Sequence, residues 1–239
     1  MPLLFLIFFL DPHSILELPV KCTKLEFYEE GVYLIQENNR AILKVDSSNN
    51  MQNIAVEGGI NNRIYGFRMA PFSIYLNMMG GIFKLSLNSG LIENIYKGDV
   101  ASFVITDAEE IILMDRLKKE ILFLDSRYKT RLIKKNFNVV DMDYFSNRIY
   151  LLTRKEIFVL DEYGNIIEKI EIPEKKEKIV VDEKIYLFSS AQKDVLVKGQ
   201  DWKKIEIGHP IIDLKATEKN IVTLSQYGDT IYIYNKSDF

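Results

Sequence analysis

The sequence predicts an all-β protein, a propeller of six four-stranded blades whose ring is closed by the N-terminal strand pairing in the last blade. The main observation is a module of two short apolar runs that recurs six times along the 239 residues. The first runs begin at Val32, Ile74, Ile111, Ile149, Ile185 and Ile221, so successive modules start 36 to 42 residues apart. A period of this length, built from strands alone, is typical of propellers with one blade per repeat. A second observation is that no stretch shows the long periodicity of a helix.

Each module divides into four strands, and the fourth module shows them most clearly. From the innermost outward, the expected strands are Val139–Tyr144, Arg148–Thr153, Glu156–Asp161 and Ile166–Ile172. Their alternation of apolar and polar residues favours half-buried β-structure. A tight turn is expected between the last two strands, where Gly164 can adopt a positive φ.

The two ends of the chain predict how the ring closes. The sixth module has three expected strands, 211–216, 220–225 and 230–235, and lacks an outer one. Ile15–Pro19, which precedes the first module, resembles the outer strands Ile170–Pro173 and Ile205–Gly208. We therefore expect this N-terminal strand to complete the last blade, which leaves no open edge between the first and last blades. The domain organisation that follows is an apolar tail or degenerate signal segment over residues 1–13 and a single propeller domain over residues 14–239.

The first module carries a resemblance to a known superfamily. Its second strand, the turn Asn38-Asn39-Arg40 and a third strand ending at Asp46 look like the pattern of NHL repeats. As an architecture, the whole ring resembles the six-bladed propellers of the NHL and TolB-like kind. That resemblance implies a superfamily and no particular activity, because such propellers include enzymes, binders and scaffolds.

Composition excludes several classes of function. The net charge is −3 with 27% charged residues, so a nucleic-acid partner is not expected. The single cysteine, Cys22, excludes an internal disulfide and a thiolate zinc site. Neither of the two histidines, His13 and His209, has a recognisable triad spacing, and His209-Pro210 is expected in a turn entering the sixth blade. We expect no cofactor and a monomer.

The N-terminal segment bears on localisation. Leu3–Leu10 is wholly apolar and is too short to span a bilayer as a helix. Its length suits the apolar part of an export signal, although no Lys or Arg precedes it. The expectation is an extracytoplasmic protein, periplasmic or secreted, if this segment is an export signal, and a cytoplasmic one otherwise.

Alignment of the innermost strands predicts a charged layer along the central channel. It places Glu26, Arg68, Ile105, Asp143, Asp182 and Lys215 at one level, with Asp141 and Asp213 one step along the same side. One interpretation is a metal or acid–base site formed by Glu26, Asp141, Asp143, Asp182 and Asp213. The other is a ring of ion pairs that neutralise one another and fill a narrow channel.

The loops predict a polarised disc. Loops between blades, and those between second and third strands, emerge on one face, to which we assign a majority of basic residues. Lys24 and Lys178 are counted among these loop bases. The residues expected to bind a partner there are Arg40, Arg63, Arg116, Lys118, Arg154 and Lys155.

Three functions follow from these patterns. The first is a binding or scaffold protein without catalytic activity, which uses the basic loop face to bind a protein or another anionic macromolecule. The second is a metal-dependent hydrolase or lactonase-like enzyme that uses the channel acids. The third is a carbohydrate or cell-surface recognition module, in which Tyr128, Tyr163 and Tyr227 would stack on sugars.

Overall fold

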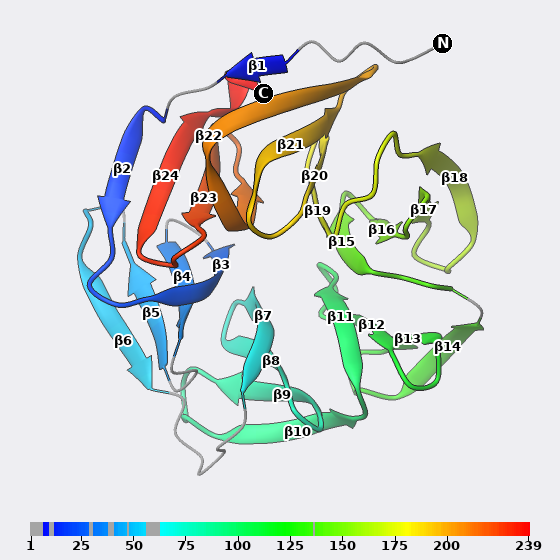
Figure 1. Ribbon diagram of the computed structural model, residues 1–239. Coiled ribbons are helices and arrows are strands. Elements are labelled where there is room, and N and C mark those ends of the chain that lie inside the picture. The colour runs from blue at the N-terminus through cyan, green and yellow to red at the C-terminus, as the bar shows by residue number, and fades with distance from the viewer. Residues whose placement is uncertain are drawn as a thin grey trace.

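The computed structural model shows sheets arranged around a common centre (Figure 1) and describes residues 7–9, 12–28, 31–37, 41–46, 48–55, 63–135 and 137–239. Apart from one short 3-10 helix, Lys236–Asp238, the regular elements of the described residues are all strands. None of the described segments forms a helix long and apolar enough to cross a membrane.

Four of the sheets are four-stranded blades in which consecutive strands pair antiparallel. The first blade comprises β3 (Cys22–Tyr28), β4 (Gly31–Gln36), β5 (Ala41–Val45) and β6 (Met51–Ala55). The second comprises β7 (Ile64–Ala70), β8 (Ser73–Met78), β9 (Gly81–Ser86) and β10 (Ile92–Lys97). The third comprises β11 (Val100–Ile105), β12 (Ile111–Asp115), β13 (Glu120–Leu124) and β14 (Thr130–Lys135). The fourth comprises β15 (Asp141–Phe145), β16 (Arg148–Leu152), β17 (Glu156–Leu160) and β18 (Ile166–Glu171), each within two residues of its expected bounds.

The remainder of the ring is one eight-stranded sheet, which differs from the two separate blades that the sequence predicts. It contains β19 (Lys178–Val181), β20 (Ile185–Phe188), β21 (Gln192–Lys198), β22 (Trp202–Ala216), β23 (Asn220–Ser225) and β24 (Thr230–Asn235). The first part of β22 pairs with β21 and its second part with β23, so the expected outer strand of one module and inner strand of the next are continuous. Gly208, at φ +72°, allows the backbone to bend within the strand.

His209 therefore lies within β22, and the expected turn at this position is wrong. Its ring stacks on Tyr232 with centroids 3.6 Å apart, and its Nε2 lies 3.2 Å from the Thr223 hydroxyl. Burial lowers the pKa of His209 to about 4, so the ring is neutral at physiological pH. His209 is a packing residue in the core of this sheet.

The N-terminal strand β2 (Ser14–Glu17) pairs antiparallel with β24, which confirms the predicted pairing. Cys22 and Leu18 donate backbone hydrogen bonds to Gly228 and Asp229 in the turn between β23 and β24. Within the expected tail, β1 (Ile7–Phe9) adds a parallel strand to β22 beside Lys204–Glu206. The two ends of the chain thus meet in one sheet (Figure 1).

The core lies between neighbouring sheets, where the second and third strands of each sheet are buried on both faces. β8 and β12, for example, have no exposed residue, whereas the outer strands β14 and β18 are mostly exposed. Leu18 on the N-terminal segment packs with Leu25, Leu34, Leu224 and Ile231, which joins the last sheet to the first blade. Burial of these apolar faces holds the blades side by side.

The aspartate that ends several third strands caps the following turn. The Asp161 carboxylate accepts backbone N–H groups from Tyr163 at 3.0 Å and Asn165 at 2.7 Å. Asp46 and Asp125 accept the equivalent pairs of N–H groups. Gly164 has φ +79°, as expected for this turn.

Candidate functional site

The innermost strands place one side chain each at a common level near the axis. These strands are β3, β7, β11, β15, β19 and the second part of β22, and each contacts the next around the ring. Their register against the second strands aligns Glu26, Arg68, Val104, Asp143, Val180 and Lys215. We call these six residues the inner layer.

Two residues earlier on each strand, a second set of side chains faces the same way because side chains alternate along a strand. It consists of Lys24, Gly66, Ser102, Asp141, Lys178 and Asp213. We call these six residues the mouth layer. It lies at the start of the inner strands, on the side of the loops that join one blade to the next.

Two residues that the sequence alignment places in the inner layer do not belong to it. Val104 rather than Ile105 lies opposite Ile112 in the third blade. Asp182 belongs to neither the inner layer nor the mouth layer. The register pairs Val180 with Tyr186, so Val180 takes the expected position and Asp182 lies in the turn after β19. Its carboxylate pairs with Lys236 at 2.8 Å and accepts the Lys184 N–H at 2.8 Å. Asp182 would reach the layer only if the turn between β19 and β20 were shorter, but the pairing of Val181 with Ile185 leaves residues 182–184 to form that turn.

The other predicted acids connect neighbouring sheets. Asp141 accepts the backbone N–H of Ile179 at 3.2 Å, and Asp143 accepts that of Val181 at 2.7 Å. Asp213 accepts the N–H of Leu25 at 3.0 Å across the junction between β22 and β3. These bonds satisfy buried N–H groups on the free edge of the next inner strand, which would otherwise be costly.

Glu26 is the centre of the ion pairs in the inner layer. One carboxylate oxygen lies 2.9 Å from Arg68 and 3.0 Å from Lys215, and Arg68 also lies 3.8 Å from Asp143. Burial raises the pKa of Glu26, but Lys215 and Arg68 outweigh it, so the net pKa is lowered. For Asp143 burial prevails over the same cations and raises the pKa.

This arrangement bears on the metal-site interpretation. Among the residues that the structure describes, no three acid, histidine or cysteine side chains converge as metal ligands. The channel carboxylates are instead bonded to backbone N–H groups and to Lys or Arg side chains. The donor set therefore fits the interpretation in which ion pairs fill the channel.

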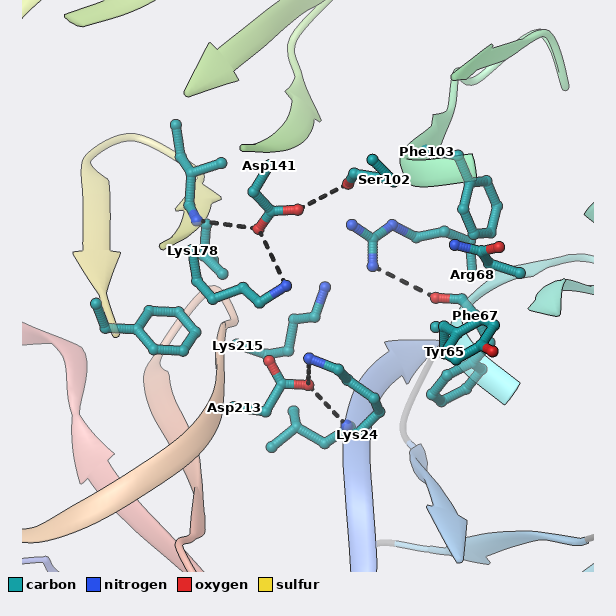
Figure 2. A pocket seen from close by; sticks show the side chains of 17 residues that line it. Lys24, Tyr65, Phe67, Arg68, Ser102, Phe103, Asp141, Lys178, Asp213 and Lys215 are labelled. Carbon is teal, nitrogen blue, oxygen red and sulfur yellow. Dashed lines mark hydrogen bonds and ion pairs between the residues drawn. The ribbon is translucent and has the colours of Figure 1, made fainter. Parts of the chain in front are cut away.

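A small cavity of about 70 Å³ lies at the mouth layer. Figure 2 shows Lys24, Arg68, Lys178 and Lys215 directed into it from four inner strands, with Asp141 and Asp213 at its walls. Lys24 and Lys178 are thus strand residues of the channel, and their assignment to the loops is wrong.

A groove of about 450 Å³ adjoins this cavity between the second and third blades, and the two share Tyr65 and Asn77. Met79 and Leu117, which line it, are 63% and 79% exposed and so offer two accessible apolar side chains in one groove. Arg116 also lines the groove and pairs with Asp99 at 3.9 Å. The groove thus combines apolar side chains with a cation.

A buried aspartate holds one side of the groove in shape. Asp115 is 1% exposed, accepts the Tyr96 hydroxyl at 2.5 Å and accepts the Lys118 N–H at 2.9 Å. These bonds fix the turn between β12 and β13 and leave Arg116 and Leu117 directed outward. The Asp115 carboxylate also lies 3.4 Å from the Lys118 ammonium, and its pKa is lowered because its hydrogen bonds outweigh burial.

The predicted basic residues divide between two places on this face. Arg116 lines the groove and Lys118 follows it in the same turn, whereas Arg154 and Lys155 line a separate depression of about 580 Å³ with Phe137 and Phe158. Arg63 is exposed before β7, and Arg40, with its NHL-like turn, lies outside the described residues.

The tyrosines proposed for sugar stacking do not form one platform. Tyr163 and Tyr227 are exposed, but their turns, β17–β18 and β23–β24, emerge at opposite ends of the antiparallel sheets. The Tyr128 hydroxyl accepts a hydrogen bond from Lys84 at 2.8 Å and lies 3.3 Å from that of Tyr75.

Sequence reasoning missed the mouth layer cations and the apolar edge of the groove. Lys24 and Lys178 could have been found by moving two residues back along each inner strand. No pattern in the sequence indicated that Met79 and Leu117 are exposed, because an apolar residue in a turn cannot be distinguished there from the apolar residues of the neighbouring strand.

Comparison with known proteins supports the propeller architecture. No protein-family model and no curated protein match the chain. Among solved structures, virginiamycin B lyase from Staphylococcus aureus is similar at 12% identity and a TM-score of 0.64, over 93% of this chain and 87% of that one. YCF48 bound to D1 peptide is similar at 11% identity and a TM-score of 0.63, over 90% and 77%. PorZ, a bacterial surface component of the type-IX secretion system of Porphyromonas gingivalis, is similar at 9% identity and a TM-score of 0.62, over 91% of this chain and 37% of that one.

These likenesses correct one prediction and leave another open. The prediction that the protein has no catalytic activity is wrong, because it was inferred from the propeller fold and the similar structures of that fold include a lyase. At such identities the likeness shows the fold alone and does not make this chain an enzyme. The resemblance to the NHL and TolB-like kind is confirmed only as far as a β-propeller.

Proposed function

We propose that this chain is a six-bladed propeller, with its last two blades joined through β22, that binds an acidic segment of a partner protein. The proposed binding surface is the groove between the second and third blades together with the cavity that it adjoins. The observation that carries the proposal is the combination of exposed Met79 and Leu117 with Arg116 in one groove beside the channel cations.

The chemistry of the surface favours a peptide with apolar and acidic side chains. Met79 and Leu117 offer apolar area that a large apolar side chain would bury. Arg116 and Lys118 favour a negatively charged neighbour and would speed its association. That YCF48 is a propeller bound to a D1 peptide supports a peptide as the class of ligand for this architecture.

The test is selection from a random peptide library against the full-length protein. We expect the selected sequences to combine Asp or Glu with at least one large apolar residue. Binding of a selected peptide should weaken by about tenfold or more in the double variant Met79→Ser with Leu117→Ser, since each loses buried apolar area.

The matched control is Phe72→Ser with Leu91→Ser. These side chains are 67% and 72% exposed, in turns at the opposite end of the same second blade. The control should bind as the unmodified protein does. Selected peptides without acidic residues, or equal loss of binding in both double variants, would contradict the proposal.

Charge should contribute separately. Reversal of Arg116 and Lys118 to Glu should strongly weaken binding of the acidic peptide, and added salt should weaken binding to the unmodified protein. Unchanged affinity of the charge-reversed variant at low salt would show that these basic residues do not contribute to peptide binding.

A further inference from the structure

The cavity at the mouth layer is surrounded by more cations than acids. Lys24, Arg68, Lys178 and Lys215 line it, against Asp141 and Asp213 (Figure 2). Glu26 and Asp143 lie in the inner layer behind Arg68 and Lys215 and are not part of its lining. The arrangement of hydrogen bonds decides which sign of charge remains available to a ligand.

The two lining acids have their oxygens engaged. Asp141 accepts the Ser102 hydroxyl at 2.7 Å on one oxygen and the Ile179 N–H at 3.2 Å on the other. Asp213 accepts the N–H of Leu214 at 3.2 Å on one oxygen and that of Leu25 at 3.0 Å on the other. Their hydrogen bonds are therefore made with backbone N–H groups and the Ser102 hydroxyl rather than with the lysine side chains.

The two mouth layer lysines are held less tightly. Lys24 lies 4.0 Å from Asp213 and Lys178 lies 4.0 Å from Asp141, which is beyond hydrogen-bonding distance. Their side chains are only 24% and 31% exposed, so water replaces the missing bonds incompletely. Burial lowers the pKa of Lys24 more than Asp213 raises it, which agrees with an ammonium group short of anionic partners.

We propose that this cavity is a binding site for one small oxyanion group, a carboxylate or a phosphate, held by Lys24 and Lys178 with Lys215 and Arg68 beneath. Charge-assisted hydrogen bonds from ammonium groups to such oxygens are short and strong. A volume of about 70 Å³ admits a single head group and not a whole organic molecule. The group can belong to a free anion or to a carboxylate of a bound partner.

The probes are sodium acetate and sodium phosphate, titrated into the full-length protein against sodium chloride of equal ionic strength. Amide NMR signals report the site, because the N–H groups of Leu25 and Ile179 follow the two lysines by one residue. We expect both anions to shift these two signals with saturation, and chloride to shift them less. Shifts no larger than those with chloride would overturn the proposal without any variant.

The variant is Lys24→Met with Lys178→Met, which keeps the apolar stems and removes both ammonium groups. We expect anion affinity to fall by about tenfold or more. The matched control is Lys129→Met with Lys219→Met, two exposed lysines outside the cavity and the groove, which should keep the affinity within about twofold. Equal affinity of the two double variants would overturn the site.

A third arm separates the two sources of the anion. A short peptide with a free C-terminal carboxylate is compared with its amidated form for displacement of phosphate. Displacement by the free form alone assigns the site to a partner's carboxylate, and no displacement by either assigns it to a free anion; both support the oxyanion site. The Met79→Ser with Leu117→Ser variant should bind phosphate normally, so failure of the proposed partner surface is distinguishable from failure of this site.

Discussion

Replacement of Glu26 by Gln is expected to lower the free energy of unfolding by about 3–5 kcal/mol, because it leaves two cations in the channel without their shared carboxylate. Glu26 is 8% exposed and lies within 3.0 Å of both Arg68 and Lys215. Gln keeps the size of the side chain but removes its charge. Chemical denaturation of the two proteins at neutral pH measures the difference.

The control is Glu120→Gln, which removes another glutamate from an ion pair. Glu120 lies 3.1 Å from Lys135, whose side chain is 69% exposed, so this pair is worth about 1 kcal/mol or less. Equal effects of the two substitutions would show that the channel pairs are no more important than surface ones.

The effect of the Glu26 substitution should depend on pH. The lowered pKa of Glu26 means that its stabilising contribution is present above the ordinary value of 4.5 and is lost as the pH falls through the folded value. The difference between the unmodified protein and Glu26→Gln should therefore shrink below about pH 4.5. In the unmodified protein burial raises the pKa of Asp143 and the charge of Glu26 adds to this, so protonation of Asp143 at acid pH acts there in the opposite direction.

Removal of the closing strand is expected to have the second large effect. A chain that begins at Lys21 lacks β2 and Leu18, and it should lose its cooperative thermal transition or melt at a much lower temperature. β2 supplies the ladder with β24, and Leu18 packs between the last sheet and the first blade. An exposed edge on β24 would also favour aggregation.

A chain that begins at His13 is the matched control. It loses β1, which also pairs at an edge of the eight-stranded sheet but contributes nothing to the pairing of β2 with β24. We expect its melting temperature to stay close to that of the full chain, in keeping with a tail over residues 1–13. Equal melting temperatures of the two shortened chains would contradict closure through β2.

The strands were predictable because the apolar runs are set by burial between sheets. In the fourth blade every strand lies within two residues of its expected bounds. The continuity of β22 was not predictable, since Gly208-His209-Pro210 reads as a turn and the hydrogen bonds that extend the strand come from distant segments. The strand pairing of Ser14–Glu17 was predictable because the last module lacks an outer strand.

The residues that line the channel were predictable only where the register between the innermost and second strands could be read from the sequence. Glu26, Arg68, Asp143 and Lys215 lie at one level along the channel. Each lies opposite the middle residue of the apolar run in the second strand of its blade, and that run is visible in the sequence. Asp182 was misplaced because the turn between β19 and β20 keeps residues 182–184, so that Val180 and not Asp182 lies opposite Tyr186. The groove could not be predicted, because it depends on where two turns of different blades approach each other and on the bonds of Asp115.

The central claim is that the loop face around the channel mouth binds the partner. Amide hydrogen exchange of the full-length protein, with and without a selected acidic peptide, tests it most directly. We expect slower exchange in the turns that carry Met79, Asp99 and Leu117 and no change in those that carry Phe72 and Leu91. Protection confined to the turns of Phe72 and Leu91, or no protection of either set by a peptide at saturation, would contradict it.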